Sequence, residues 1–311
     1  MQALNKLDSR SQQSNASADG LALPFVKMHG LGNDFVMLKS ADLPVGVNLE
    51  KLAARLCDRH FGIGADGLIL DGVATSANQD FDIRFVYLNG DGSWAEMCGN
   101  GIRCFARFVY DAGIVQKTQF KAETLAGPIQ PRLNPDQSVT VDMGAPILQA
   151  SDIPFKAEGV SPGAIVENQV LSVLGKQVPI SAVSMGNPHC LIFQQDLGQP
   201  LAPDVFGPAL ETHPAFPNKT NVEFLEVIDE HTLRCIVWER GCGFTLACGT
   251  GACAAAVSAI RLGKVKSPVT VHLPGGPLTI EWAGSTHPVM MTGPATYAFS
   301  GVIILDLEQL K

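Results

Sequence analysis

Apolar and polar positions follow the same order in two separate parts of this chain. In FDIRFVYLNGDGS (81–93) apolar and polar residues alternate up to a glycine-rich turn, which is typical of a half-buried strand leaving for a loop. HTLRCIVWERGCG (231–243) repeats this pattern. Both stretches lead to apolar residues at helical spacing, which are Ile102, Phe105, Ala106 and Val109 in the first copy and Ala252, Ala255, Ala256 and Ile260 in the second. The pattern therefore predicts a strand, a loop and a buried helix twice.

A cysteine followed by glycines stands at the predicted start of each helix. The sequences are EMCGNGIRC (96–104) and LACGTGACA (246–254). A glycine suited to a left-handed helix end follows each cysteine by 15 positions, at Gly113 and Gly263. The spacing to other polar residues also repeats: Asn89 and Glu239 each precede their cysteine by nine positions, and Asn33 and Asn187 precede theirs by 65 and 61. The chain is therefore interpreted as two related halves.

The predicted halves meet at a glycine- and proline-containing stretch over 142–146, DMGAP. The first twenty residues are polar, without periodicity and without the apolar core of a signal peptide. They are predicted to form a disordered N-terminal tail. The strands and helices together predict an α/β (α+β) fold.

Composition narrows the function classes. The 311 residues are 46% hydrophobic and 17% charged, which is typical of a globular protein. A net charge of −8 argues against a nucleic-acid partner, and no apolar run reaches the ~20 residues of a membrane span. None of the eight cysteines forms a CxxC pair, so the spacing predicts no metal site, and most cysteines are expected to be reduced. We expect no membrane partner and a cytoplasmic location, with a plastid stroma left open.

The position of the two cysteines suggests acid–base chemistry. The first N–H groups of a helix have no partner within the helix, and the helix dipole places partial positive charge there. Such a position can lower the pKa of a thiol from about 8.5 toward neutrality. The adjacent glycines leave backbone N–H groups free to hold a carboxylate. Two such sites in related halves predict two thiols on opposite faces of one substrate carbon, which suits inversion next to a carboxylate. No motif for a cofactor stands out, and cofactor-free chemistry is favoured.

Seven motifs, in order from about Phe25 to the C-terminus, together resemble those of the diaminopimelate epimerase family. They are HGLGNDFV (29–36), RHFGIGADG (59–67), YLNGDGSWAEMCGNGIRCFARF (87–108), MGNPHC (185–190), TNVEF (220–224), ERGCGFTLACGTGACA (239–254) and LPGG (273–276). The resemblance implies conversion of L,L-2,6-diaminopimelate to the meso form in lysine biosynthesis, without cofactor or metal.

The resemblance also implies an architecture. The family fold has two pseudo-symmetric lobes, each a mixed sheet rolled into a barrel-like shape around a central helix, with the active-site cleft between them. In this family the last strand returns to the first lobe, around Ser300–Leu307 here. The predicted domains are a tail over 1–20, an N-terminal lobe over 21–146 plus 300–311, and a C-terminal lobe over 147–299. A homodimer is a possible assembly.

Residue roles follow from the motif positions. Cys98 and Cys248 resemble the two acid–base thiols. The residues that correspond to the family's substrate-binding positions are Asn33, Asn89, Gly99, Asn100, Asn187, Asn221, Glu239, Arg240, Gly249 and Thr250. Arg240 suits the distal carboxylate of a substrate that is an amino acid at both ends, and Glu239 with the amides suits its ammonium groups. For His189, a role in proton movement near a thiol and a structural role behind Pro188 are both open.

Some positions depart from the pattern or carry no role. Gly67 stands where some family members have a glutamine that reaches the substrate. Cys242 and Phe244 lie in a variable part of the ERG loop. Arg103 and Arg107 are predicted to lie on a solvated helix face.

Two alternatives to this assignment remain. One is a proline or hydroxyproline racemase, which shares the fold and the paired thiols. The other is a cysteine-rich metal-binding or redox-sensing protein.

Overall fold

The chain folds into two compact units. The computed structural model describes residues 20–75 and 80–306. Unit 1 comprises the residues up to Val141 and those from Pro294 onward, and unit 2 runs from Asp142 to Gly293. The sequence-based boundaries at 146 and 300 lie a few residues beyond these divisions. Apart from Gly20, the tail predicted over 1–20 lies outside the described residues.

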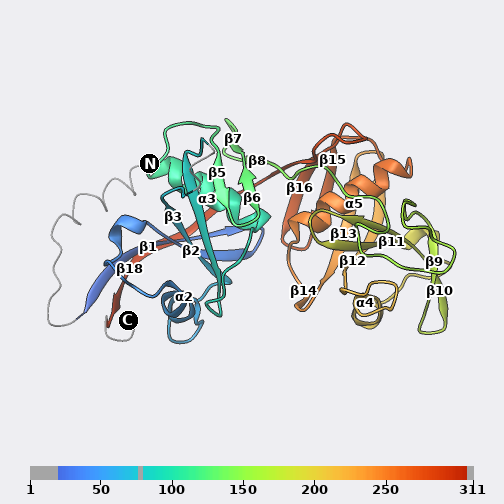
Figure 1. Ribbon diagram of the computed structural model, residues 1–311, viewed down its shortest axis with the longest axis horizontal. Helices are drawn as coiled ribbons and strands as arrows, with labels where there is room; N and C mark the ends of the chain where they lie inside the picture. Colours follow the sequence, from blue (N-terminus) through green and yellow to red (C-terminus); the bar gives the residue numbers. More distant parts are fainter. Residues whose placement is uncertain (1–19, 76–79, 307–311) are drawn as a thin grey trace. The chain divides into compact units, whose positions relative to one another are not determined.

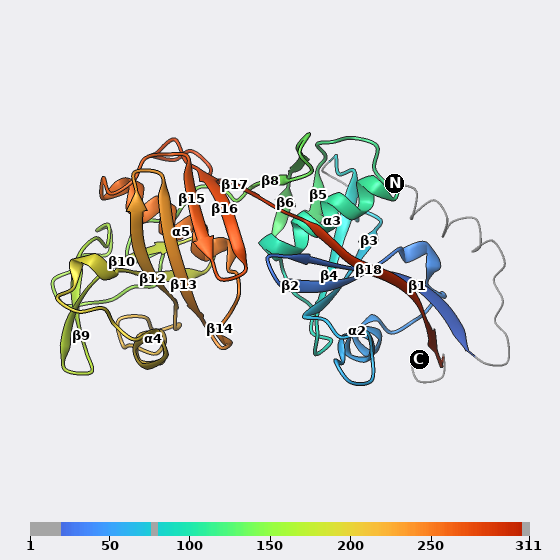
Figure 2. The ribbon, with the colours of Figure 1, turned by 180° about the vertical axis from the view of Figure 1, so that it is seen from behind.

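Unit 1 contains a seven-stranded mixed sheet in the order β18-β1-β2-β3-β4-β5-β6 (Figure 1). The strands β7 and β8, which do not belong to this sheet, pair as an antiparallel hairpin. Its last strand, β18, pairs antiparallel with β1, as Figure 2 shows from behind. Its elements are β1 (Leu21–Gly30), β2 (Asn33–Leu38), η1 (Ser40–Asp42), α2 (Leu49–Cys57), β3 (Gly67–Gly72), β4 (Ile83–Asn89), α3 (Gly99–Asp111), β5 (Ala122–Thr124), β6 (Gly127–Ile129), β7 (Pro131–Leu133), β8 (Val139–Asp142) and β18 (Thr296–Leu305).

Helices cover both faces of the unit 1 sheet, which explains the continuous apolar runs in its inner strands. Side chains alternate between the faces of a strand. On β2, Val36 and Leu38 pack with Leu52 and Leu56 of α2. Phe35, one residue before Val36, lies on the other face, beneath the first turn of α3. The run FVML is therefore buried on both sides, as expected for strands covered by two layers.

Unit 2 has a mixed sheet in the order β9-β10-β11-β12-β13-β15-β16-β17, with the short β14 paired to β13. Helix α4 packs on one face through Phe206 and Leu210, and α5 contacts strands from β10 to β16. Its elements are β9 (Gln169–Val173), β10 (Lys176–Ser184), β11 (Pro188–Phe193), η2 (Gln194–Asp196), α4 (Pro203–Glu211), β12 (Asn221–Asp229), β13 (Thr232–Glu239), β14 (Gly243–Phe244), α5 (Gly249–Arg261), β15 (Val269–Leu273), β16 (Gly276–Glu281) and β17 (Met290–Gly293).

The two units share one topology. The strand order β18-β1-β2-β3-β4-β5-β6 matches β9-β10-β11-β12-β13-β15-β16, and each pairing has the same direction. β2 is parallel to β3 as β11 is to β12, and β4 is parallel to β5 as β13 is to β15. The helices α2 and α4, and α3 and α5, occupy corresponding connections. This topology confirms the two related halves predicted from the repeated pattern.

Both central helices end as the sequence predicts. Gly113 and Gly263 each follow the C-cap residue and have φ of 71° and 67°. A residue with a Cβ is strained in this left-handed region, so glycine suits both positions. None of the helices within residues 20–75 and 80–306 has the length and apolar character needed to span a membrane.

Candidate active site

Cys98 and Cys248 are the N-cap residues of α3 and α5, with nearly the same local geometry. Both have extended backbone, with φ and ψ of −141° and 119° for Cys98 and −118° and 111° for Cys248. Each sulfur accepts a hydrogen bond from the N–H three residues later, at 3.4 Å, from Gly101 and Gly251 respectively. Neither helix has an acidic residue in its own first turn, so the helix itself does not reduce the partial positive charge at its N-terminus.

In unit 1 the thiol of Cys98 lies against two of the predicted substrate-binding amides. Its Sγ is 3.5 Å from Oδ1 of Asn33, and the same oxygen accepts a hydrogen bond from Nδ2 of Asn100 at 3.2 Å. Asn33 sits at the start of β2, and Asn100 in the first turn of α3. The sheet and the helix thus place the two amides and the thiol together.

The prediction that Arg103 lies on a solvated helix face is wrong, because α3 is enclosed and Arg103 is 0% exposed. Its guanidinium donates to the backbone oxygens of Gly99 and Pro294, at 3.0 and 3.2 Å, and to Oδ1 of Asn100 at 3.0 Å. Buried charge is tolerated where hydrogen bonds satisfy it. Arg103 therefore fixes the first turn of α3 and the side chain of Asn100. The signal in the sequence is the run of apolar neighbours around Arg103, which are Ile102, Cys104, Phe105 and Ala106.

Arg107, one turn further along α3, is half-buried rather than fully solvated. Its Nε lies 2.5 Å from Oδ2 of Asp111, and its guanidinium stacks 5.6 Å from the centre of the Tyr297 ring.

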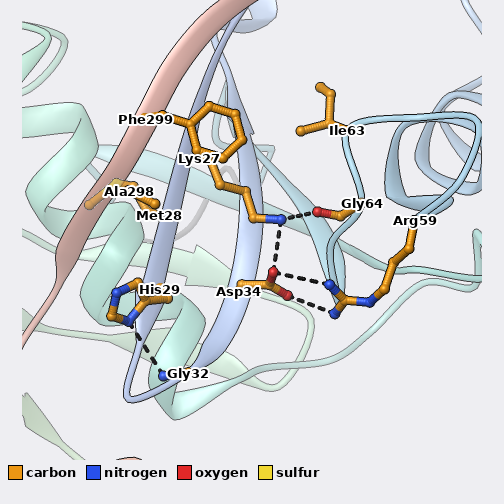
Figure 3. Close-up of a pocket in the computed structure, with 10 residues that line it drawn as sticks. All are labelled: Lys27, Met28, His29, Gly32, Asp34, Arg59, Ile63, Gly64, Ala298 and Phe299. Atoms are coloured by element: carbon orange, nitrogen blue, oxygen red, sulfur yellow. Dashed lines mark hydrogen bonds and ion pairs between the residues drawn. The ribbon is translucent and has the colours of Figure 1, made fainter.

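A network of charged side chains lies behind Asn33 and lines a cavity of about 380 Å³ (Figure 3). Asp66 accepts a hydrogen bond from Nδ2 of Asn33 at 2.8 Å, which turns the amide oxygen of Asn33 toward the thiol. Arg59 bridges Asp66 and Asp34, at 2.8 and 3.0 Å, and Lys27 pairs with Asp34 at 2.8 Å. Because carboxylates and cations balance in this network, its role is to hold Asn33 rather than to attract an anion.

The glycine at 67, where some family members have a glutamine, has no room for a side chain. A Cβ at Gly67 would lie 2.5 Å from Cε2 of Tyr87 and 2.7 Å from the backbone oxygen of Leu88. Gly67 pairs across β3 and β4 with the predicted substrate-binding residue Asn89, whose Nδ2 donates to Oγ of Ser93 at 3.0 Å. The ring of Tyr87 thus fills the space beside Asn89.

Replacing Gly67 by alanine is expected to lower the free energy of unfolding by about 1–3 kcal/mol, because the added methyl group overpacks the contact with Tyr87 and Leu88. Denaturant unfolding followed by circular dichroism measures the change. Gly163→Ala is the matched control, since a Cβ at Gly163 meets nothing within 4 Å. Equal stability of the two variants would contradict the tight packing at Gly67.

In unit 2 the expected lowering of the thiol pKa does not occur. Burial, and then the negative charges of Glu239 and Glu223, raise the pKa of the Cys248 thiol well above its usual value. The hydrogen bonds from Thr250 and Gly251 act in the opposite direction but are outweighed. The sequence pattern identifies the helix end but not the two carboxyl groups beside it. Cys248 is consequently a protonated thiol, suited to donate a proton.

Two side chains of the MGNPHC motif form a hydrogen-bonded chain with Glu223. Nδ1 of His189 lies 2.7 Å from Oε1 of Glu223, and Nε2 lies 3.0 Å from Oδ1 of Asn187. His189 and Glu223 are both 0% exposed. Glu223 was not among the predicted site residues. Its signal in the sequence is a carboxyl group between the apolar residues of a central strand, in TNVEF.

Asn221 and the ERG loop are joined by hydrogen bonds. Oδ1 of Asn221 accepts the backbone N–H of Arg240 at 2.9 Å, and its Nδ2 donates to the backbone oxygen of Pro188 at 3.1 Å. Asn221 is buried, so it holds the two loops together, whereas the side chain of Arg240 is exposed and its Nη1 donates to Asn218. Burial, and then the charge of Glu223, raise the pKa of the Glu239 carboxyl. Such shifts are typical of functional sites.

The predicted residues thus form one cluster in each unit. The cluster in unit 1 contains Cys98, Gly99, Asn100 and Asn33, with Asn89 at the end of β4, and that in unit 2 contains Cys248, Gly249, Thr250, Glu239, Arg240, Asn221, Asn187 and His189. Oγ1 of Thr250 lies 3.4 Å from the Cys248 sulfur. Cys242 and Phe244 are exposed in the ERG loop. All eight cysteines fall in the described residues and are free thiols. Over 20–75 and 80–306, no three His, Cys, Asp or Glu side chains are arranged to hold a metal ion.

Known proteins resemble this chain over nearly its whole length. Diaminopimelate epimerase from Heliobacterium modesticaldum is 50% identical over 291 residues, which cover 91% of this chain and 100% of the relative. The enzyme of the same name from Ralstonia pickettii is 46% identical, covering 94% and 98%. That from a Picosynechococcus strain is also 46% identical, covering 92% and 100%.

Solved structures with low sequence identity share the fold. A hydroxyproline epimerase from Agrobacterium vitis, with bound trans-4-hydroxy-L-proline, superposes with a TM-score of 0.61 at 15% identity, covering 92% of this chain and 93% of that one. A methylitaconate-delta-isomerase superposes with a TM-score of 0.64 at 18% identity, covering 94% and 98%. The sequence model of the diaminopimelate epimerase family matches residues 25–149 and 181–298. With cysteine-capped helices in both units and relatives up to half identical, this chain is a member of the diaminopimelate epimerase family.

Proposed function

We propose that the protein converts L,L-2,6-diaminopimelate to meso-2,6-diaminopimelate in lysine biosynthesis, by cofactor-independent acid–base catalysis with two thiols. The observation that carries the proposal is the repeated cysteine at a helix N-terminus. Cys98 and Cys248 have matching backbone geometry and matching hydrogen bonds, in units of matching topology. Membership of the family supplies the substrate. An enzyme with two equivalent acid–base groups suits a reaction whose substrate and product are related by inversion.

The reaction proceeds by removal and return of a proton at the α-carbon. The thiolate of one cysteine takes the α-proton, so that a C–H bond breaks and an S–H bond forms. The thiol of the other cysteine gives a proton to the opposite face, so that its S–H bond breaks and a new C–H bond forms. The two cysteines exchange protonation states, and in the next turnover they act in the reverse direction or re-equilibrate with water. General acid–base catalysis of this kind contributes about 10²–10⁴-fold to the rate.

Removal of the α-proton is the difficult step, because the C–H bond at the α-carbon is only weakly acidic. Backbone N–H donors assist this step. Negative charge develops on the carboxylate oxygens as the proton leaves. Gly99 and Asn100 at the start of α3, and Gly249 and Thr250 at the start of α5, have N–H groups in the first turn, where no helical carbonyl accepts them. These groups stabilise the developing charge without reorganising. Each 1.36 kcal/mol removed from the barrier raises the rate tenfold.

Charge in unit 2 suits Cys248 to the role of acid in the resting protein. The neighbouring carboxyl groups of Glu239 and Glu223 and the burial of the sulfur raise the pKa of its thiol. The sulfur of Cys98 contacts the amide oxygen of Asn33, which also accepts a hydrogen bond from Asn100. We therefore assign Cys248 as proton donor and Cys98 as proton acceptor in the first turnover.

Most of the remaining predicted residues hold the distal amino-acid end. Arg240 suits the distal carboxylate, because its exposed guanidinium offers several N–H donors. Asn89 and Asn187 supply amides, and Glu239 supplies a negative charge for an ammonium group. Fixing this end is how the enzyme demands an L configuration there. Asn33 lies at the reacting centre beside Cys98, and the buried Asn221 holds the ERG loop in place.

The cellular location, the partners and the assembly of the protein belong to the same proposal. The relatives come from bacteria, including a cyanobacterium, which supports a cytoplasmic enzyme. The net charge of −8 supports a protein that binds no nucleic acid. The edge strand β18 exposes Phe299, Val302 and Ile304 by 53–60%, which supports a homodimer. Light scattering after size exclusion measures that assembly.

Solvent isotope incorporation tests the proposed function. In deuterium oxide, with each stereoisomer as substrate, deuterium is expected at the α-carbon of the product before it appears in the recovered substrate. The reason is that the proton given to the new face comes from a thiol already exchanged with solvent. Proton NMR at early conversion measures both pools.

Two controls separate this function from the alternatives. Proline and hydroxyproline should show no exchange, and exchange into proline but not diaminopimelate would replace the proposal with racemisation of proline. A requirement for stoichiometric zinc, or for a disulfide in the active form, would instead assign the cysteines to metal binding or redox sensing.

A further inference from the structure

A fully buried histidine–carboxylate pair lies beneath the first turn of α5. His189 extends from β11 and Glu223 from β12, and their 2.7 Å contact joins Nδ1 to Oε1. Glu223 is also in direct contact with the cysteine turn, since a Cβ at Gly251 would lie 2.7 Å from its Oε1. Within the described residues, Oε2 of Glu223 has no hydrogen-bond partner. Burying such groups costs free energy, so the pair calls for an explanation.

Unit 1 builds the same turn without any polar pair. Phe35 lies opposite Gly67 across β2 and β3, and His189 lies opposite Asn221 across β11 and β12. Phe35 therefore corresponds to His189, and Gly67 corresponds to Asn221. Two residues further along β3 stands Ile69, the counterpart of Glu223. A Cβ at Gly101 would meet Ile69 at 3.1 Å and Phe35 at 3.5 Å. An apolar pair thus supports the cysteine turn in unit 1, so a turn of this geometry can be built without a polar pair beneath it.

The number of protons on His189 and Glu223 determines how the pair orients Asn187. Oδ1 of Asn187 is only an acceptor, so Nε2 of His189, at 3.0 Å from it, carries a proton. A second proton lies between Nδ1 and Oε1 of Glu223, so that the pair is an imidazolium beside a carboxylate. In this form Nε2–H points to Asn187. Without the acidic group, the ring would have one proton for two nitrogens.

We propose that Glu223 is a positioning residue that acts through His189 on Asn187, so that this amide presents its NH₂ group to a carboxylate of the substrate. The carbonyl oxygen of Asn187 is occupied by Nε2–H, which leaves its Nδ2 as the end available for binding. Asn187 stands in the loop before β11 and is half-buried, whereas His189 and Glu223 behind it are closed off. The inference rests on the proposed function, which assigns Asn187 to substrate binding, and it adds a reason for the buried pair.

The decisive variant is Glu223→Gln, which keeps the size and the acceptor oxygen but removes the charge and the extra proton. The ring is then neutral and carries a single proton. We expect the Gln oxygen to accept Nδ1–H, so that Nε2 becomes an acceptor and the Asn187 amide rotates to donate to it. The amide oxygen then faces the substrate carboxylate and repels it. We expect KM for diaminopimelate to rise and kcat/KM to fall by about 10- to 100-fold, the effect of losing one hydrogen bond to a charged group.

Nitrogen NMR of the ligand-free protein measures directly which ring nitrogen of His189 carries a proton. With ¹⁵N-labelled histidine, the wild-type His189 ring is expected to show an Nε2 that carries a proton, and Glu223→Gln an unprotonated one. The double variant His189→Phe with Glu223→Ile copies the apolar pair of unit 1. It is expected to fold with at least wild-type stability, to lack the His189 signal among the seven histidines and to share the loss in kcat/KM.

Glu226→Gln is the matched control, because Glu226 lies on the same strand but is solvent-exposed and pairs with Arg234. It should leave kcat, KM and the His189 signals unchanged. Wild-type kcat/KM together with a protonated Nε2 in Glu223→Gln would overturn the proposal. The two proposals fail separately. A wild-type protein that does not turn over diaminopimelate refutes the proposed function, whereas the NMR of the ligand-free protein tests the positioning role of Glu223.

Discussion

Cys98→Ala and Cys248→Ala are each expected to lower kcat for epimerisation by at least about 10⁴-fold. Each thiol is the only proposed acid–base group on its face of the α-carbon, and general acid–base groups contribute about 10²–10⁴-fold each. Because the two thiols act as a unit, removing both should cost little more than removing one. Inversion is measured by following the meso product from the L,L isomer by chromatography of chiral derivatives.

Cys253→Ala controls for the substitution itself. Cys253 lies in the same helix as Cys248 and is fully buried, but it has no proposed role. Its variant should retain most of the activity, and all three should show the same circular dichroism spectrum. Near-wild-type epimerisation by either Cys98→Ala or Cys248→Ala would refute the two-thiol scheme.

The single variants also separate proton removal from inversion. A protein with one thiol left can take the α-proton and return it to the same face. Slow deuterium uptake into recovered substrate, with no epimerised product, is therefore expected for one isomer in each variant. This isotope pattern distinguishes loss of the opposing acid from general damage to the site.

The two related halves and their central helices could be predicted from the sequence because the repeat consists of local signals. Alternation, helical spacing and the glycines at 113 and 263 each depend on neighbouring residues, and the structure has strands, helices and helix ends there. Helix N-caps at Cys98 and Cys248 follow from the same local rules.

The sequence pattern could not predict contacts between residues far apart in the chain. Arg103 is buried because carbonyls from both its own helix and Pro294, 191 residues away, satisfy its guanidinium. The pKa of the Cys248 thiol is raised because strands β12 and β13 bring Glu223 and Glu239 beside it. The sequence around the helix start predicts the effect of the helix dipole, but it does not predict the charged groups that other strands bring near the thiol. For Cys248, burial and those charges outweigh the effect of the dipole on the pKa.

Arg240→Met is expected to lower kcat/KM for diaminopimelate by about 10²–10³-fold. The proposed bond between the guanidinium and the distal carboxylate is charge-assisted, and this part of the substrate does not react. Binding energy from a remote group also holds the reacting centre in place, so kcat should fall along with the rise in KM. The control is Arg234→Met, because Arg234 is exposed on β13 and pairs with Glu226. Steady-state kinetics in both directions measure the two constants.

Lysine provides the matching change in the substrate, since it is diaminopimelate without one carboxylate. If Arg240 binds the distal carboxylate, lysine already lacks the partner that the variant removes. The slow solvent exchange at the α-carbon of L-lysine should then be the same in wild-type protein and in Arg240→Met, within about twofold, while exchange into diaminopimelate falls steeply. A proportional fall for both compounds would place Arg240 at the reacting carboxylate instead, and the distal end would need another cation. Because the backbone N–H of Arg240 is held by Asn221, the methionine variant keeps the loop anchored, and the comparison tests the side chain alone.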